Sequence, residues 1–166
     1  MTDKFIVEPL SKLHDRETFD CGEENLNIFL KRFARQNDAK GFSRTFVAVR
    51  PGEPKILGYY TLASGSFGFD LVPEDLPRYP VPVIHLGRLA VDRASQGMRL
   101  GQALLFHALE RSTNIADQLG IYAVEVYALN RSAKDFYLTF GLTELADDKF
   151  HLYIPIKTIK KLLSTK

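Results

Sequence analysis

Residues 84–109 read Ile-His-Leu-Gly-Arg-Leu-Ala-Val-Asp (84–92), Arg-Ala-Ser-Gln-Gly-Met-Arg-Leu-Gly (93–101) and Gln-Ala-Leu-Leu-Phe-His-Ala-Leu (102–109). The first part is apolar and contains β-branched residues, which predicts a buried strand. The third part has apolar residues at helical spacing, and the part between them is a polar loop with two glycines. Because backbone N–H groups converge where such a loop enters a helix, this arrangement predicts an anion site. We expect the loop to bind the pyrophosphate of a coenzyme.

The composition is that of an ordinary globular protein. The chain has 166 residues, a net charge of +2 and a single cysteine, Cys21. We therefore expect one domain spanning residues 1–166, no disulfide and no metal site. No signal-peptide pattern is present and no apolar run approaches the length of a membrane span, so we expect a cytoplasmic protein without a membrane partner.

Periodicity predicts an α/β protein with a mixed sheet and helices packed over it. Residues 83–128 form a β-α-β unit, whose two strands should be parallel and adjacent. Expected strands are residues 5–10, 45–49, 56–63, 83–91, 121–128 and 150–156, of which 45–49 and 56–63 should form a hairpin; expected helices are 26–37, 100–119, 131–140 and a basic tail. Gly120 should end the helix 100–119, and Asn130 should cap the helix 131–140.

The first predicted helix should have one buried face and one basic face. Asp20 is its expected N-terminal cap. The buried face comprises Leu26, Phe29, Leu30, Phe33 and Ala34, whereas Lys31, Arg32 and Arg35 fall off this stripe. The proline-containing segment 64–82 is either a lip over a substrate or a surface excursion with a turn of helix around Glu74. The sequence leaves both interpretations open.

Two motifs give the chain a resemblance to the GCN5-related N-acetyltransferases (GNAT superfamily). Gln96-Gly97-Met98-Arg99-Leu100-Gly101 resembles the coenzyme-A signature of that family, with Arg99 where glycine is usual. Residues 136–142, Phe-Tyr-Leu-Thr-Phe-Gly-Leu, resemble its second conserved helix. The resemblance implies the GNAT fold, a strongly twisted mixed sheet with a V-shaped splay between two central parallel strands. Its coenzyme-binding core should lie at about residues 83–141.

The resemblance also implies that acetyl-CoA is the co-substrate. Its pantetheine arm should follow the strand at Leu89, Ala90 and Val91, and its phosphates should bind the loop. The residues implied in coenzyme binding beyond that strand are Gln96, Gly97, Met98, Arg99, Leu100, Gly101, Gln102, Asn130, Ala133 and Phe136. Arg99 either takes an ordinary backbone conformation and adds a charged contact to phosphate, which we favour, or points to solvent.

Tyr137 is the expected general acid. A phenol is protonated at neutral pH and can donate to the departing CoA thiolate. The alternative is a buried tyrosine that only packs under the sheet. No general base is evident, because His85 is more often structural at such a position and Glu125 could merely orient substrate.

The resemblance extends to GNAT toxins of type II toxin–antitoxin systems and covers nearly the whole chain, through residues 19–22, 41–48, 58–63, 86–92 and 151–155. It implies acetylation of the α-amine of aminoacyl-tRNA and neutralisation by a ribbon-helix-helix antitoxin, and toxins of this family are often homodimers. The tRNA phosphates would need basic residues. The candidates are Lys31, Arg32, Arg35, Lys40, Arg44 and the tail lysines, together with Arg88, which has a structural ion pair as its alternative role.

Two other functions remain open at this point. The chain could acetylate a small-molecule amine or a protein amino group. It could also be a non-catalytic module that binds coenzyme A or an antitoxin, although Tyr137 argues against that function.

Overall fold

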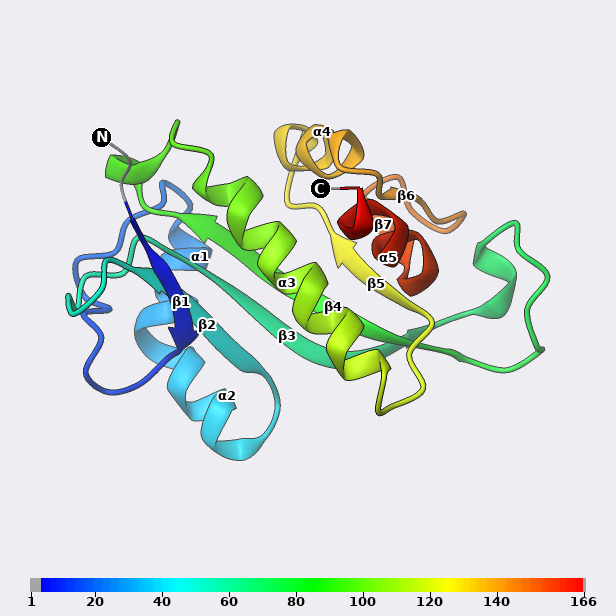
Figure 1. Cartoon of the computed structure of the whole chain (residues 1–166), viewed down its shortest axis with the longest axis horizontal. Helices are drawn as coiled ribbons and strands as arrows, with labels where there is room; N and C mark the ends of the chain where they lie inside the picture. The colour runs from blue at the N-terminus through cyan, green and yellow to red at the C-terminus, as the bar shows by residue number, and fades with distance from the viewer. Residues whose placement is uncertain (1–3, 166) are drawn as a thin grey trace. The chain divides into compact units, whose positions relative to one another are not determined.

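The computed structural model describes residues 4–165 (Figure 1). The contacts within it group the chain into two compact units. The first unit holds residues 4–63 and 87–108, and the second holds residues 64–86 and 109–165. Three elements pass from one unit to the other: β3 (Gly58–Phe67), β4 (Val81–Val91) and α3 (Leu100–Ala116). The strand order is β1-β2-β3-β4-β5-β7-β6, which confirms the predicted mixed sheet.

Antiparallel strands build the first unit. β1 (Ile6–Pro9) pairs with β2 (Arg44–Val49), and β2 pairs with the first half of β3, with Arg44 opposite Leu62. The predicted hairpin is therefore confirmed. Side chains on one face of these strands are buried and pack against the helical segment that follows residue 23, and together they form a hydrophobic core. This core comprises Leu10, Phe19, Phe29, Leu30, Ala34, Val47, Val49, Ile56, Tyr59 and Ala90.

The first predicted helix is broken into three pieces: α1 (Glu24–Ile28), a π-helical turn η1 (Phe29–Phe33) and α2 (Ala34–Lys40). The π turn adds a residue to the local repeat and rotates the apolar stripe. Phe33, predicted to be buried, is consequently 47% exposed. The expected cap is also wrong, because Glu23 occupies the N-cap position. The Asp20 carboxylate instead accepts hydrogen bonds from Gly22 N and Asn27 Nδ2.

The second unit contains the parallel pair. β4 runs parallel to β5 (Ala123–Tyr127) with three matched pairs, Val83–Ala123, Ile84–Val124 and His85–Glu125. β5 also pairs antiparallel with β7 (His151–Pro155), and β7 pairs with the short β6 (Thr143–Glu144). The predicted parallel arrangement is thus confirmed. The core of this unit comprises Phe67, Val72, Val81, Val83, Ala123, Leu145 and Tyr153.

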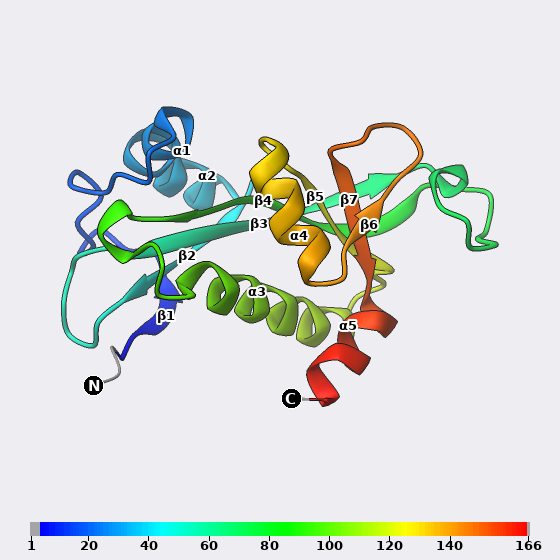
Figure 2. The ribbon, with the colours of Figure 1, turned by 90° about the horizontal axis from the view of Figure 1, so that it is seen from above.

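Helices of the second unit begin and end close to their predicted bounds. α4 (Arg131–Thr139) is capped by Asn130, whose Oδ1 accepts the N–H of Ala133 at 2.9 Å, as predicted. α3 ends at Ala116, before the predicted stop at Gly120. The tail forms α5 (Ile156–Ser164), which packs against β5 and β7 (Figure 2). Among residues 4–165, no helix combines the length and the apolar character needed to span a membrane.

The segment between β3 and β4 differs from its prediction in two respects. β3 continues to Phe67, four residues beyond the expected end at Ala63. A Cβ at Gly65 would lie 3.1 Å from Glu125 Oε2, so any other residue at this position would require the Glu125 side chain to shift by a few tenths of an ångström. The helical turn, η2, is at Phe69–Leu71 rather than around Glu74.

Candidate active site

The loop between β4 and α3 is held at its base by polar contacts in the first unit. Asp92, 4% exposed, accepts the N–H groups of Asp20 and Ala94 at 3.0 and 3.1 Å. The Gln96 side-chain amide donates to the carbonyls of Val91 and Cys21 at 3.0 and 3.1 Å. Since these bonds occupy the Gln96 amide, its side chain orients the loop, and the anion-binding capacity lies in the backbone that follows.

That backbone has two residues in the left-handed conformation, Gly97 with φ of +89° and Arg99 with φ of +61°. The expected ordinary conformation of Arg99 is therefore wrong. Arg99 adopts the conformation that glycine adopts without steric cost. Left-handed residues within a turn direct successive N–H groups toward one side of the loop, and such N–H groups form an anion-binding concavity.

α3 extends the same donor set. It begins at Leu100, and its first turn is closed by the bond from Ala103 N–H to the Arg99 carbonyl at 3.1 Å. The N–H groups of the first helical residues have no acceptor within a helix, and the helix dipole adds partial positive charge there. Leu100 is buried and anchors the turn, whereas Gly97, Met98 and Arg99 are exposed. Residues 97–102 can thus bind a phosphate group.

The strand before this loop contributes backbone and apolar side chains. Ala90 is buried in the core of the first unit, and its neighbours Leu89 and Val91 are half-buried. The backbone of such a strand can form hydrogen bonds with an extended ligand, and its half-buried apolar side chains can pack beside that ligand.

The predicted acid Tyr137 lies in the second unit on α4. It is 6% exposed, and its ring packs edge-to-face against Phe136, with 5.3 Å between the ring centroids. Burial raises the pKa of the Tyr137 phenol well above its usual value, so the side chain stays protonated throughout the physiological range. Ala133 and Phe136, on the same helix, are half-buried. The cap at Asn130 uses its side-chain oxygen, which leaves its amide group as the donor for a ligand.

A row of titratable groups in the second unit is only partly visible in the sequence. Glu125, 7% exposed at its side chain, faces His85 Nδ1 at 3.2 Å and His151 Nε2 at 2.6 Å. His151 Nδ1 in turn faces both oxygens of Asp147 at 3.0 Å. The sequence singled out His85 and Glu125, but it missed His151 and Asp147. The only available signal was a His and an Asp flanking the last strand.

The basic residues predicted to bind tRNA differ in their exposure and in their contacts with other side chains of the protein. Arg32 and Arg35 are exposed and Lys31 is half-buried. Arg44 pairs with Asp38 at 3.0 Å, which reduces its charge available to phosphate. The Arg88 guanidinium lies over the Phe29 ring, 3.5 Å from its centroid, and burial lowers its pKa. Its observed interaction is therefore a cation–π contact.

The excursion between β3 and β4 is tied to the second unit. The Glu74 carboxylate accepts hydrogen bonds from the hydroxyl groups of Tyr122 and Tyr153, at 3.1 and 2.8 Å. Burial and the adjacent Glu74 charge raise the pKa of Tyr122 to about 12. This anchoring is not typical of a loose surface loop.

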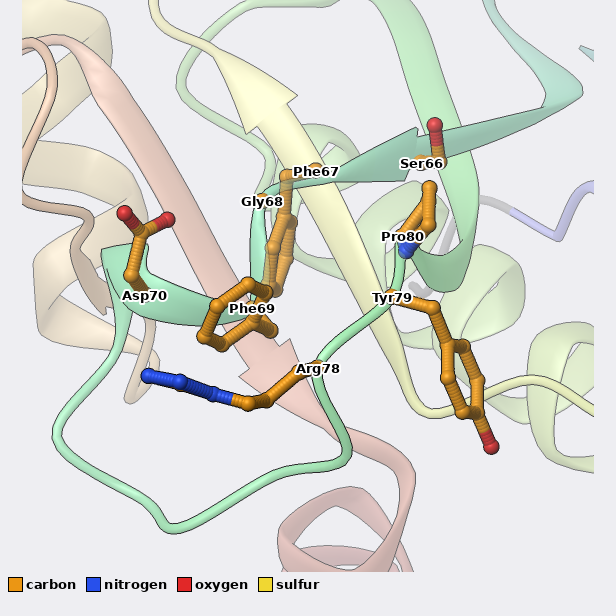
Figure 3. Close-up of a pocket in the computed structure, with 8 residues that line it drawn as sticks. All are labelled: Ser66, Phe67, Gly68, Phe69, Asp70, Arg78, Tyr79 and Pro80. Atoms are coloured by element: carbon orange, nitrogen blue, oxygen red, sulfur yellow. The ribbon is translucent and has the colours of Figure 1, made fainter.

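A cavity of about 460 Å³ opens at the base of this excursion, lined by residues 66–70 and 78–80 (Figure 3). Arg78 extends beside the Phe69 ring, 5.4 Å from its centroid, whereas the Tyr79 ring points away from both. The lining therefore combines aromatic rings with one cation, Arg78, and one carboxylate, Asp70.

Comparison with known proteins adds a family to these observations. A family model described as "Acetyltransferase (GNAT) family" matches residues 8–142, which include residues of both units. A tRNA-acetylating toxin of Mycobacterium tuberculosis is 39% identical over 157 residues, with 93% of each chain covered. A probable toxin TacT of Sinorhizobium fredii is 28% identical over 173 residues, with 96% of each chain covered.

Solved structures of similar proteins agree. A tyrosine-to-phenylalanine variant of KacT has a TM-score of 0.90 and 32% identity, over 95% of this chain and 98% of that chain. AtaT complexed with acetyl-methionyl-tRNAfMet has a TM-score of 0.90 and 32% identity, over 96% and 99%. AtaT has also been solved bound to the C-terminus of the antitoxin AtaR, and AtaTR bound with AcCoA.

Proposed function

Because this chain belongs to the acetyltransferase (GNAT) family, we propose that it transfers the acetyl group of acetyl-CoA to the α-amine of an aminoacyl-tRNA. The observation that carries the proposal is the loop at residues 97–102, where two left-handed residues and the start of α3 present backbone donors. It lies inside the matched segment and has the donor set that a pyrophosphate requires.

In this proposal the coenzyme phosphates bind the N–H groups of residues 97–102, and its pantetheine arm follows Leu89–Val91. Asn130, Ala133 and Phe136 contact the coenzyme from α4 and its N-cap. The protonated Tyr137 donates to the sulfur as the carbon–sulfur bond breaks. The raised pKa of Tyr137 supports this role to the extent that it keeps the proton on the phenol until the thiolate forms.

The acceptor is inferred from the relatives and from charge. The relative from Mycobacterium tuberculosis is a tRNA-acetylating toxin, and AtaT was solved with an acetylated aminoacyl-tRNA. Arg32 and Arg35 are exposed on the first helical segment and suit contacts with tRNA phosphates. An aminoacyl ester has a less basic amine than a free amino acid, which makes it an accessible nucleophile near neutral pH.

The proposed biological role follows from this chemistry. An acetylated α-amine cannot be elongated in the ordinary way, so the chain would block translation in the cytoplasm, where charged tRNA is used. We propose that a ribbon-helix-helix antitoxin neutralises it, as the complex of AtaT with AtaR supports.

The decisive test uses radiolabelled acetyl-CoA with a total charged tRNA pool, and deacylated tRNA as the control. We expect label that is sensitive to RNase and is released as N-acetyl amino acid by mild base. Label on polyamines or on protein, with none on charged tRNA, would instead assign the chain to small-molecule or protein acetylation. In the same assay Tyr137→Phe should lower kcat while the Kd for acetyl-CoA stays within about twofold, since only the transition-state donor is removed.

A further inference from the structure

Four titratable side chains in the second unit form a continuous row from one partly exposed end to the other. His85 of β4 contacts Glu125 of β5, Glu125 contacts His151 of β7, and His151 contacts Asp147 in the preceding turn. Glu125 and His151 are 7% and 2% exposed at their side chains, whereas His85 and Asp147 are 33% and 36% exposed. Both ends of a buried polar row are therefore accessible.

The contacts determine where the protons lie. His151 has a carboxylate at each ring nitrogen, Asp147 at Nδ1 and Glu125 at Nε2, so both nitrogens face acceptors. Burial opposes ionisation of Glu125, but the polar contacts with His85 and His151 outweigh it, and the pKa of Glu125 falls below its usual value. Glu125 is therefore an anion with one oxygen used by His151 and the other turned to His85.

His85 then has a defined tautomer. Its Nδ1 is buried and makes no hydrogen bond among the described residues, and the acceptor nearest to it in the row is Glu125 Oε2 at 3.2 Å. A proton on Nδ1 is stabilised by this carboxylate, as in catalytic triads, where an acid orients the histidine base. The lone pair is consequently on Nε2, at the partly exposed edge of the ring.

The position of His85 in the sheet is the second observation. His85–Glu125 is the last matched pair of the parallel register, although β4 continues to Val91 and β5 to Tyr127. Ligands of α/β proteins bind where parallel strands separate at their carboxyl ends. Tyr127 follows at that end of β5, is 52% exposed, and its ring lies edge-on to His85, with 6.3 Å between the ring centroids.

Tyr127 and Gly65 also border the His85–Glu125 pair. Tyr127 also stacks on His151, with 4.0 Å between the ring centroids, and burial together with the charges of Glu125, Asp147 and Asp148 raises the pKa of the Tyr127 phenol. It therefore stays protonated. Gly65 of β3 lines the same cluster without a side chain.

We propose that His85 Nε2 takes the proton from the α-ammonium group of the acceptor, and that Glu125, His151 and Asp147 position it. This inference rests on the proposed function. The freed nitrogen lone pair forms the bond to the acetyl carbon, and the carbon–sulfur bond breaks with its electron pair on sulfur. Sulfur takes the proton of Tyr137, which is replaced by the second proton lost from the acceptor nitrogen. His85 then releases the first proton to solvent, so the reaction yields amide, CoA thiol and one proton.

The test compares His85→Gln with the wild type on the charged tRNA pool, measuring kcat/KM from pH 6.5 to 8.5. We expect a loss of about 100-fold at pH 6.5, at the lower end for a general base. The loss should narrow to about tenfold at pH 8.5, because an amine with a pKa between 7 and 8 loses its own proton there. KM for charged tRNA should stay nearly constant.

The matched control is His14→Gln. His14 also pairs with a glutamate, with 2.6 Å between His14 Nε2 and Glu8 Oε2, but it lies in the first unit and outside the proposed machinery. Its kcat/KM should equal that of the wild type at every pH. If the loss of kcat/KM in His85→Gln does not vary with pH, or if kcat/KM does not fall at all, His85 is not the general base. Either result would leave the acetyltransferase function intact. A wild type that labels no charged tRNA would overturn both the base and the proposed function.

A second measurement uses the wild-type protein, with no substitution in the row from His85 to Asp147. The chain has four histidines, so their ring nitrogens can be resolved by ¹⁵N NMR. We expect His85 in the Nδ1–H tautomer, with the lone pair on Nε2. His85 protonated on Nε2 instead would contradict the proposal, because that nitrogen would have no lone pair for the acceptor.

Discussion

Replacing Arg99 by glycine should stabilise the protein. Arg99 has φ of +61°, a conformation that costs a residue with a Cβ about 1–2 kcal/mol. Glycine removes this cost but gives the unfolded chain more freedom, which offsets about 0.4–1 kcal/mol. The net gain is about 0–1.6 kcal/mol, centred on about 0.8 kcal/mol, which corresponds to a rise in Tm of about 2–3 °C for a chain of this size.

The assay is thermal and urea unfolding of the wild type, Arg99→Gly and Arg99→Ala without ligand. Arg99→Ala is the matched control, because it loses the same guanidinium group but keeps a Cβ in the left-handed conformation. It should be no more stable than the wild type. If Arg99→Gly melts below Arg99→Ala, the left-handed conformation does not carry the assumed strain and the reasoning is refuted.

The same two variants separate backbone from side chain in coenzyme binding. If the guanidinium contacts a phosphate, both should bind acetyl-CoA about tenfold or more weakly, since hydrogen bonds to charged groups contribute about 1.5–3 kcal/mol. If only backbone amides bind the phosphates, both should bind with unchanged Kd. A loss in Arg99→Ala alone would show that glycine improves the loop geometry enough to replace the side chain.

Three further changes have expected outcomes. Converting both Arg32 and Arg35 to Glu should weaken tRNA binding and lower its salt dependence, as measured by filter binding at several ionic strengths, whereas Lys12→Glu should not. The pKa of Glu125 is lowered, so the stability that its carboxylate contributes is complete above its ordinary pKa of 4.5 and is lost as pH falls through the folded-state pKa. In urea titrations Glu125→Gln should therefore be less stable than the wild type at pH 7, and its free energy of unfolding should fall less between pH 5 and pH 3. Asn130→Ala should lower the free energy of unfolding by about 1 kcal/mol, because the bond to Ala133 N–H caps α4; an unchanged unfolding midpoint would contradict that assignment.

The sequence determined the features that depend on neighbours along the chain. Apolar runs and helical spacing located the strand, loop and helix at residues 84–109, and the Asn130 cap followed from side-chain chemistry three residues from its partner. Charge and periodicity likewise identified Arg32 and Arg35 as exposed. Helical periodicity failed at η1. The π turn there depends on how the segment packs in the tertiary structure, and it leaves Phe33 exposed.

Only the tertiary structure decided which distant groups meet. The row from His85 to His151 joins residues 66 positions apart through the registers of β4 with β5 and β5 with β7, and strand register is set by long-range packing. The sequence placed Glu125 in a strand, but its charge state depends on two histidines that pairing brings to it. Arg99 illustrates the same limit on a smaller scale, because its side chain favours an ordinary backbone and the turn from β4 into α3 imposes the left-handed one.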